Sequence, residues 1–366
     1  MNKNNTKKNW VRYKEAELKK LAPMLESIGF ALEEEQAHIS GERHLMSGFK
    51  LVLNGLKKDD GKKVIIKASS HKDGIKEIRH EHDSREAIRT IDFAYRDFLL
   101  PEEILFTEKN GFLISITLFI NQKKSFLEHD LKEQFFLTLR ALETQEGTHV
   151  TTRSHLNKIN KIFGVMKSDD YLNSMDIFIK TCAEYNPDNI FLKKTLDNAF
   201  DFLKTNELIL KKFSDFLTHS DFVPHNIRII NHDMYLLDHT SILFGNKHES
   251  WARFMNYMII YNPNLEHALA QYVRQNREDE EYLSLRLMRV YKIVFLLNFY
   301  SGALDKTEGD LNKLTKIWII FWAKCLEAIL EDKQINEKIV LEYKKERDAL
   351  RSDEEKLRQK KLKQLF

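Results

Sequence analysis

The spacing of apolar residues changes several times along the chain, and each change predicts a different kind of element. Between residues 10 and 30, leucines and an isoleucine recur every three or four positions, which is the period of an amphipathic helix. From about Ala31 the runs "FALEEEQAHI", "FKLVLNGLKK" and "KKVIIKASS" are typical of strands. An Asp-Gly turn at Asp59–Gly61 separates the last two runs, so we expect a three-stranded meander over residues 31–70.

The following region continues the alternation between helix and strand patterns. A charged helix is predicted from about Gly74 to Leu99, and Pro101 stops it. The run "EEILFTEKNGFLISITLFI" then predicts a second hairpin, because Asn110-Gly111 is a typical two-residue turn between apolar runs. Together these elements predict a small lobe built around an antiparallel sheet.

Beyond Asn121 the pattern is helical almost to the end of the chain. The exception is a short segment in which "NIRII" and "MYLLD" predict two small strands joined by "NHD". The most apolar runs, "YKIVFLLNFYSGAL" and "IWIIFWAKCLEAIL", are shorter than the roughly 20 residues of a membrane span. We therefore expect both runs to form core helices.

These elements predict an α+β fold with a small, β-rich N-terminal lobe and a larger helical C-terminal lobe. The first lobe is expected over residues 1–120, the helical lobe over residues 121–333 and a charged helical tail over residues 334–366. The tail ends in "KLRQKKLKQLF", which predicts a solvated helix. Weak contact of this basic segment with an anionic membrane or a partner protein is the alternative.

Composition narrows the class of protein without identifying it. The 366 residues carry a formal net charge of +3, which is too small to indicate nucleic-acid binding. The N-terminal stretch "MNKNNTKKNWVRYKEAELKK" lacks the apolar centre of a signal peptide. Cys182 and Cys325 are too far apart for a zinc or disulfide framework, so we expect a reducing, cytoplasmic location and no transmembrane segment.

One stretch, "LTHSDFVPHNIRIINHDMYLLDHTSILFGN", concentrates polar groups between apolar runs. Asp221 and Asn226 lie five positions apart, and Asp238 follows the predicted hairpin, which can return the chain toward both. Mg²⁺ prefers such carboxylate and amide oxygens together with phosphates and water. Phosphoryl transfer from a nucleotide needs these ligands, a carboxylate beside the acceptor hydroxyl and a cation on the inner phosphates.

The segments "HSDFVPHNI" and "LLDH" resemble the catalytic loop and metal-binding turn of the aminoglycoside phosphotransferase and choline kinase superfamily. Members of that family have the bilobal protein-kinase-like fold and phosphorylate small molecules. The resemblance implies that Asp221 orients the acceptor hydroxyl and can take its proton, that Asn226 and Asp238 bind Mg²⁺, and that His219 braces the loop. Val223 stands where protein Ser/Thr kinases commonly carry a lysine, which favours a small-molecule hydroxyl as acceptor.

The first lobe adds a further match, because "KVIIK" resembles the third strand of a kinase small lobe. The resemblance implies that Lys67 contacts the α and β phosphates of ATP, with GTP as the alternative nucleotide, and that a helix glutamate holds its ammonium. Glu86, in "SREAIRTI", is the preferred partner by its separation from Lys67 and its sequence context. Glu81 stays open, since it shares a helix face with Ile78 and Ile88.

Other nucleotide contacts follow from the same resemblance. The run "FLISITLFINQ" is similar to the strand that leads to the hinge, so backbone groups near Thr117, Phe119 and Ile120 are expected to bind adenine. The loop "SGERHLMSG" lacks the G-x-G-x-x-G pattern of many kinases. Within it, Ser40 and Ser47 are candidates for binding phosphate through their hydroxyls.

After Asp238 the sequence departs from the family pattern. Many relatives carry a further Asp that starts the next helix and braces the catalytic loop, whereas this region contains Glu249, Ser250 and Arg253. We therefore expect either a different brace or a less rigid loop. Together with the glycine-poor loop, this departure motivates the alternative of a nucleotide-binding regulatory protein with little or no activity.

Other residues of the chain allow further interpretations. His225, His232 and His239 show no common zinc spacing, so we do not expect them to bind a metal. Aromatic residues of the last third are expected in the core, with the acceptor pocket as the alternative for some of them. This group comprises Phe295, Tyr300, Trp318, Phe321 and Trp322. A kinase-like enzyme that modifies protein or lipid-linked glycan is a weaker alternative, and the sequence does not distinguish aminoglycosides, choline-like compounds and sugars as acceptors.

Overall fold

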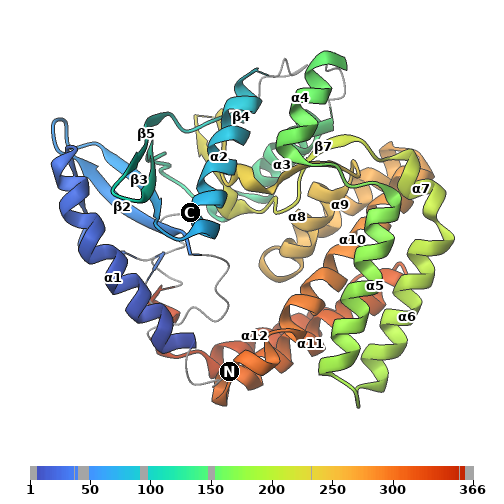
Figure 1. The fold of residues 1–366 in the computed structure, drawn as a ribbon. Coiled ribbons are helices and arrows are strands. Elements are labelled where there is room, and N and C mark those ends of the chain that lie inside the picture. Colours follow the sequence, from blue (N-terminus) through green and yellow to red (C-terminus); the bar gives the residue numbers. More distant parts are fainter. Residues whose placement is uncertain are drawn as a thin grey trace.

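The computed structural model has two lobes, a sheet-containing first lobe and a mostly helical second lobe (Figure 1), which confirms the predicted fold class. It describes residues 6–36, 38–39, 49–90, 98–146, 153–231, 233–353 and 355–358. Ser40, Ser47 and His232 therefore lie outside the described residues, and so do the last eight residues of the tail, 359–366.

Five antiparallel strands form the sheet of the first lobe, in the order β1-β2-β3-β6-β5. The strands are β1 (Phe30–Leu32), β2 (Leu51–Lys57), β3 (Lys63–Ser69), β5 (Glu103–Lys109) and β6 (Phe112–Leu118). Both predicted hairpins are confirmed. Asn110 and Gly111 turn the second one with φ angles of 49° and 80°, the positive values that tight hairpin turns require. The strand predicted at "FALEEEQAHI" is shorter than expected, because only its first three residues pair with β2.

The two faces of this sheet have different partners, because side chains alternate along each strand. Helix α1 (Thr6–Ser27) packs against one face, where Ile66 and Ala68 of β3 are completely buried (Figure 1). Lys67 lies between them in the strand, so its side chain is directed to the opposite face. Helix α2 (Lys72–Thr90) lies on that face and provides the partner of Lys67.

Helix α2 ends earlier than the sequence pattern predicts. The pattern indicates helix as far as Leu99, whereas the helix ends at Thr90 and residues 91–97 lie outside the described part of the chain. Strand β4 (Phe98–Leu99) pairs in parallel with β9 (Asp233–Leu236) of the second lobe. Local periodicity could not reveal this strand, because its hydrogen-bonding partner is distant in the sequence.

The second lobe packs its helices around one large apolar core (Figure 1). The helices are α3 (Leu131–Glu146), α4 (Arg153–Phe163), α5 (Ser168–Tyr185), α6 (Ile190–Thr205), α7 (Glu207–Lys212), α8 (Glu249–Tyr261), α9 (Pro263–Asn276), α10 (Asp279–Ser301), α11 (Gly309–Leu330) and α12 (Glu337–Leu350). The two apolar runs lie in α10 and α11 and are core helices, as predicted. By length and composition the segment Asp279–Lys306 passes as a membrane span, but 61% of its most apolar window is buried inside the protein.

Helix α12 belongs to the core of this lobe and is not a fully solvated tail. Val340 and Tyr343 are buried, and the ring of Tyr343 stacks on Phe321 of α11 with 4.0 Å between ring centroids. The tail is therefore helical at its start, as predicted, but this part packs against the lobe. Most of the basic ending lies in residues 359–366, outside the described residues.

Two short pairs of strands hold the polar loop. Strand β7 (Phe216–His219) pairs with β10 (Ile242–Gly245), and β8 (Ile227–Ile230) forms the predicted hairpin with β9. The sequence pattern did not predict β7 or β10, whose pairing also joins distant segments. Between the strands the chain makes single 3₁₀ turns, so the polar residues sit on short connections whose ends are fixed by hydrogen bonds.

Candidate active site

The loop after β7 brings Asp221 and Asn226 into contact. The Nδ2 group of Asn226 donates to the backbone carbonyl of Asp221 at 2.8 Å and to its Oδ2 at 3.3 Å. The single 3₁₀ turn at Pro224–Asn226 closes the loop in this way. The backbone N–H of Leu237 donates to the carbonyl of Asn226 at 2.8 Å, so the hairpin returns the chain to the same place. Asp238 is the next residue, and the three polar residues of the predicted loop are therefore neighbours.

The carboxylate of Asp238 is held by two hydroxyl groups. The residue has a φ of 53°, in the left-handed region that non-glycine residues adopt only where surrounding contacts hold them. Oγ1 of Thr240 donates to Oδ1 of Asp238 at 2.6 Å, and Oγ of Ser241 donates to Oδ2 at 3.1 Å. These bonds keep the carboxylate ordered immediately after the hairpin.

His219 links the start of the loop to the end of the hairpin. Its side chain is buried, and its Nε2 donates to the carbonyl of Leu237 at 3.1 Å. This contact ties β7 to the residue before Asp238. This contact is consistent with the bracing role predicted for His219. It accounts for the position of the imidazole without a role in proton transfer.

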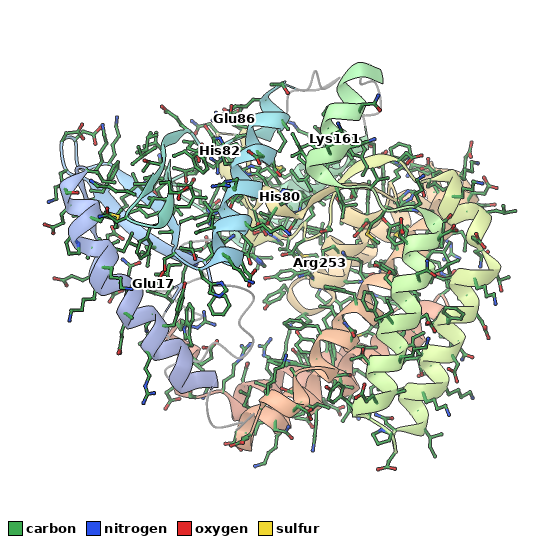
Figure 2. All side chains as sticks on the ribbon, in the orientation of Figure 1. Glu17, His80, His82, Glu86, Lys161 and Arg253 are labelled. Atoms are coloured by element: carbon green, nitrogen blue, oxygen red, sulfur yellow. The ribbon has the colours of Figure 1, made fainter. Side chains whose placement is uncertain are left out.

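In the first lobe, Lys67 forms an ion pair with Glu81 of α2, whose side chain is only 3% exposed. The preference for Glu86 is wrong. Glu86 lies further along α2, its side chain is 47% exposed, and it pairs with Arg89 at 2.6 Å (Figure 2). Glu81 lies on the same buried face as Ile78, which is the alternative that the helical pattern left open.

A second lysine, Lys50, also reaches Glu81 and was missed by the sequence analysis. Its Nζ lies 3.6 Å from Oε2 of Glu81 and 3.7 Å from a carboxylate oxygen of Glu77. Lys50 directly precedes β2, and the next residue but one, Val52, pairs with Lys67 in the sheet. In the sequence, Lys50 is marked only by its position between the glycine-poor loop and a predicted strand. That position does not indicate which carboxylate it contacts.

Charged groups of both lobes influence the pKa values of Lys67, Lys50 and Glu81. Burial is the strongest influence on the pKa of Lys67 and lowers it, while the carboxylates of Glu81 and Asp238 act in the opposite direction. For Lys50, burial is outweighed by Glu81, Asp238 and Glu77, and the pKa is raised. For Glu81, burial is outweighed by Lys67 and Lys50, which hold its pKa well below the usual range. Asp238 of the second lobe therefore lies within electrostatic range of both lysines of the first.

Solved phosphotransferases share this arrangement of lobes. The apo form of a thermostable mutant of aminoglycoside phosphotransferase APH(4)-Ia matches with a TM-score of 0.57 and 14% identity, over 84% of this chain and 97% of that chain. The chain has the kinase-like fold of the aminoglycoside phosphotransferases.

Two further structures show the same kinase-like fold. Macrolide 2'-phosphotransferase type I matches with a TM-score of 0.54 and 12% identity, over 83% of this chain and 97% of that chain. Amicoumacin kinase hAmiN, solved with AMP-PNP, Ca2+ and Ami, gives a TM-score of 0.51 and 13% identity, over 80% of this chain and 88% of that chain. No protein-family model matches the sequence, and no curated protein matches it.

Within this kinase-like fold, Ser250 holds the loop that carries Asp221. Its Oγ accepts from the backbone N–H of His219 at 2.8 Å and lies 2.7 Å from Oγ1 of Thr218. Glu249 does not take this place, because its carboxylate is buried against Tyr171 at 2.6 Å and Lys292 at 2.9 Å. Of the two expectations, a different brace or a less rigid loop, these contacts favour a different brace, in which a hydroxyl of α8 contacts the start of the loop.

Arg253 is the second residue of α8 that contacts this loop. Its Nε donates to Oδ1 of Asp221 at 2.7 Å, and Figure 2 shows it on the side of the second lobe that faces the first. Burial has the largest single influence on the pKa of Asp221 and tends to raise it. Arg253 is the strongest of the influences that together outweigh burial and hold the pKa below its ordinary value. Burial lowers the pKa of the neighbouring His225 to about 4, so its ring is neutral at pH 7. A cation from α8 thus stands beside Asp221, although Val223 occupies the usual lysine position.

The predicted hinge begins where β6 ends. Thr117 lies in the sheet, with its backbone between β3 and β5. The N–H of Phe119 donates to the carbonyl of Lys63 at 3.0 Å, so this donor is not available to a nucleotide base. Ile120 is the first of the three predicted residues after these sheet contacts. Adenine binding at the hinge stays a prediction that rests on Ile120 and the carbonyl groups beside it.

The oxygen donors of the loop fit Mg²⁺ and do not fit zinc. Among the described residues, no group of three or more His, Cys, Asp and Glu side chains could hold a metal ion. Asn226 and Asp238 instead offer one amide oxygen and one carboxylate. Mg²⁺ commonly binds one or two carboxylates and completes its shell with phosphates and water, so it suits a site of this kind.

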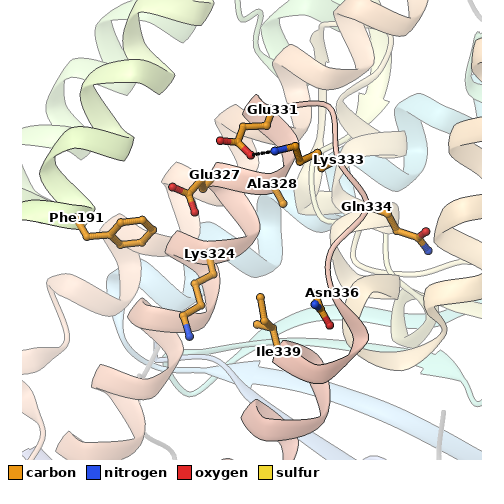
Figure 3. Close-up of a pocket in the computed structure, with 9 residues that line it drawn as sticks. All are labelled: Phe191, Lys324, Glu327, Ala328, Glu331, Lys333, Gln334, Asn336 and Ile339. Atoms are coloured by element: carbon orange, nitrogen blue, oxygen red, sulfur yellow. Dashed lines mark hydrogen bonds and ion pairs between the residues drawn. The ribbon is translucent and has the colours of Figure 1, made fainter.

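A surface groove of about 410 Å³ lies elsewhere on the second lobe, along α11 and the segment that leads to α12 (Figure 3). Phe191 of α6 and Lys324 of α11 contribute to its walls, and Glu331 pairs with Lys333 at 2.8 Å within it. None of the residues of the candidate active site lines this groove, so it belongs to a different part of the molecule.

Proposed function

We propose that the protein is an ATP- and Mg²⁺-dependent phosphotransferase that acts on a hydroxyl group of a small molecule. The observation that carries this proposal is the convergence of Lys67 and Lys50 from the first lobe with Asp238 and the Asp221 loop from the second. Transfer of a γ-phosphoryl group needs cations near the phosphates and carboxylates near the metal and the acceptor. The likeness to solved phosphotransferases, among them amicoumacin kinase hAmiN with AMP-PNP, supports the proposal at the level of the fold.

The first lobe would bind the nucleotide. Lys67, held in place by Glu81, would contact the inner phosphates, and Lys50 would add a second positive charge beside them. Lys67, Lys50 and Arg85 lie within 3.9 Å of the carboxylate of Glu81, while Lys50 also lies 3.7 Å from Glu77 and Arg85 pairs with Glu103 at 2.5 Å. The two ammonium groups would contact the polyphosphate, and adenine would bind at the hinge near Ile120.

The second lobe would carry the chemistry of transfer. Asn226 and Asp238 would hold Mg²⁺, which neutralises charge on the transferred phosphoryl group when it is bound. Asp221 would orient the acceptor hydroxyl and receive its proton, a role that needs an ionised carboxylate. Arg253 keeps Asp221 ionised and oriented, and His219 keeps the loop in place.

We further propose a cytoplasmic enzyme with a small-molecule substrate and no nucleic-acid partner. Cys182 and Cys325 are both buried free thiols, which supports a reducing environment. Contact of the basic C-terminal segment with a membrane or partner remains an untested alternative, because most of that segment lies outside the described residues.

Substitution of Asp221 by Asn tests this function directly. The full-length protein would be assayed for AMP-PNP binding by calorimetry and for ADP release from ATP in the presence of Mg²⁺ and hydroxyl acceptors. We expect Asp221→Asn to bind AMP-PNP like the wild type and to lose roughly 10²- to 10⁴-fold in turnover, the usual contribution of a general base. Full turnover in the variant would exclude the assigned role. A wild type that binds AMP-PNP but never releases ADP would favour the regulatory alternative.

A further inference from the structure

Helix α8 presents a single accessible row of side chains beside Asp221. All residues of α8 are buried except Arg253, Tyr257 and Tyr261. Positions four apart lie on one face of a helix, so these residues form a continuous row, which we call the α8 row. The row starts at the carboxylate of Asp221, which Arg253 contacts, and it runs away from the catalytic loop along the helix.

The α8 row is largely an aromatic surface. The rings of Tyr257 and Tyr261 stack with 4.3 Å between centroids and 15° between planes. Tyr257 also lies 5.9 Å from the ring of His225 in the catalytic loop. Tyr300 of α10 packs on Trp318 with 4.7 Å between centroids, and it too is incompletely buried. Partly exposed aromatic surface of this kind can bind a flat ring by stacking.

Guanidinium groups set the charge around these rings. Burial raises the pKa of Tyr300 to about 12, while Arg253 and Arg351 both act to lower it, so two guanidinium groups lie within electrostatic reach of this phenol. Arg347 of α12 lies 5.6 Å from the centre of the Tyr343 ring. Arg253 of α8 and two arginines at the end of α12 therefore lie in the same region as these aromatic residues.

The carboxylates that accompany these arginines are already in ion pairs. Asp221 is paired with Arg253, and Asp348 accepts from Arg347 at 2.8 Å and lies 3.8 Å from Arg351. Three guanidinium groups share two carboxylates, which leaves an excess of positive charge. A polycation would be repelled there, whereas an anionic group would gain charge-assisted hydrogen bonds to a guanidinium.

We propose that the acceptor is an alcohol that carries a flat ring and an anionic group, a class that excludes polycationic aminoglycosides. The inference rests on the proposed function and specifies its substrate. The ring stacks on Tyr257 and Tyr261, the anionic group pairs with Arg351, and the hydroxyl lies at Asp221. In the transfer the hydroxyl oxygen forms a bond to the γ-phosphorus, and the bond from that phosphorus to the oxygen bridging to the β-phosphate breaks. Asp221 takes the hydroxyl proton, and the products are a phosphate ester and ADP.

A matched series of benzyl alcohols isolates the effect of charge. Full-length protein with ATP and Mg²⁺ would be assayed by ADP release with benzyl alcohol, para-(hydroxymethyl)benzoate, para-(hydroxymethyl)benzylamine and hygromycin B. The first three share one ring and one hydroxyl, and release without acceptor gives the background with water. We expect kcat/KM for the benzoate to exceed that for the benzylamine by at least about tenfold, with no transfer to hygromycin B.

Variants assign the preference to individual side chains. Arg351→Gln should bring the benzoate and the benzylamine to similar kcat/KM values, because the group that distinguishes them is gone. Tyr257→Leu should lower kcat/KM for all three ring-bearing alcohols alike, because stacking does not depend on their charge. Arg274→Gln, at an exposed arginine of α9, is the matched control. It should change neither the preference for the benzoate over the benzylamine nor kcat/KM for the three ring-bearing alcohols. Thermal unfolding and AMP-PNP binding establish that each variant is folded.

The possible results separate the inference from the function on which it rests. Equal use of the two charged alcohols, preference for the benzylamine or hygromycin B, or an unchanged preference in Arg351→Gln overturns the acceptor class alone. Absence of transfer to every benzyl alcohol, with ADP release to water intact, overturns it as well. Failure to bind AMP-PNP and to release ADP would overturn the proposed phosphotransferase instead.

Discussion

Arg253 donates from Nε to Oδ1 of Asp221 at 2.7 Å, although 32 positions separate the two residues. The other carboxylate oxygen of Asp221, Oδ2, accepts from Asn226 at 3.3 Å. Each oxygen therefore has its own donor, and the carboxylate has a defined orientation before any acceptor binds. In the proposed reaction this preorganisation would contribute to rate, because the reacting group does not have to be ordered during the reaction.

Replacement of Arg253 should reduce turnover and leave nucleotide binding unchanged. Arg253→Met removes the donor to Asp221, and we expect kcat to fall by roughly 10- to 100-fold because the carboxylate loses its orientation and its positive neighbour. Arg253→Lys keeps the charge without the same hydrogen bond, so its kcat should lie between that of the wild type and that of Arg253→Met. Steady-state kinetics and AMP-PNP calorimetry measure the two effects. A wild-type kcat in Arg253→Met, or a large loss of AMP-PNP affinity, would contradict this position for the arginine.

Glu81 and Glu86 form a natural pair for testing the partner of Lys67. Glu81→Gln removes a buried carboxylate from three cations, and loss of one partner from a buried pair typically costs ~3–5 kcal/mol of unfolding free energy. The same change should lower kcat/KM for ATP, because Lys67 loses its fixed position. Glu86→Gln alters an exposed pair with Arg89 and should stay within about 0.5 kcal/mol of wild type. Urea unfolding and ATP kinetics on both variants decide which glutamate matters, and equal effects would contradict the assignment.

Lys50 should contribute to phosphate binding and not to adenine binding. Lys50→Met is expected to weaken AMP-PNP binding about tenfold, because the phosphates lose one of two nearby ammonium groups, while adenosine binds as before. The difference in AMP-PNP affinity between wild type and Lys50→Met should shrink as salt is added. Screening weakens the attraction that Lys50 contributes in the wild type. Lys57→Met, in the exposed hairpin at the other end of β2, is the control and should bind both ligands normally. Calorimetry with the two ligands gives the comparison, and equal weakening of adenosine would indicate a general disturbance of the lobe.

The residues that could be predicted from the sequence lie on continuous short segments. His219, Asp221 and Asn226 share one loop, and Asp238 follows one hairpin, so their spacing along the chain reflects their spacing in the fold. Lys67 could be placed because a β-meander has a fixed alternation of faces. In each case the relevant geometry is local, and a short stretch of sequence contains all of it.

The contacts that the sequence did not decide join distant segments. Glu81 and Glu86 are five positions apart and point about 140° apart around α2, so the choice depends on which helix face meets the sheet. Ser250 and Arg253 act on the loop only because α8 packs back against it. Lys50 follows residues without a strong periodic pattern. No local propensity encodes these contacts, and only the packing of the lobes brings them together.

Buried His248 makes the stability of the second lobe depend on pH. Its side chain is inaccessible, and its Nδ1 lies 3.0 Å from Oγ of Ser284. Burial, with the nearby charges of Lys247 and Arg277, holds its pKa well below the ordinary 6.5, so the ring is neutral in the folded protein. Below about pH 6.5 the unfolded chain binds a proton that the folded chain does not. The free energy of unfolding should therefore fall as the pH is lowered from 7.5 to 5.5, by ~1.4 kcal/mol for this one group.

His248→Gln removes this proton uptake and isolates the effect. The variant keeps a polar group near Ser284 but cannot be protonated, so its loss of stability between pH 7.5 and 5.5 should be smaller than that of the wild type by ~1.4 kcal/mol. Urea unfolding at the two pH values measures the difference, and comparison of slopes cancels any constant cost of the substitution. His267→Gln on the exposed side of α9 is the matched control and should follow the wild type at both pH values. Parallel losses in wild type and His248→Gln would show that the buried ring contributes nothing to the pH dependence.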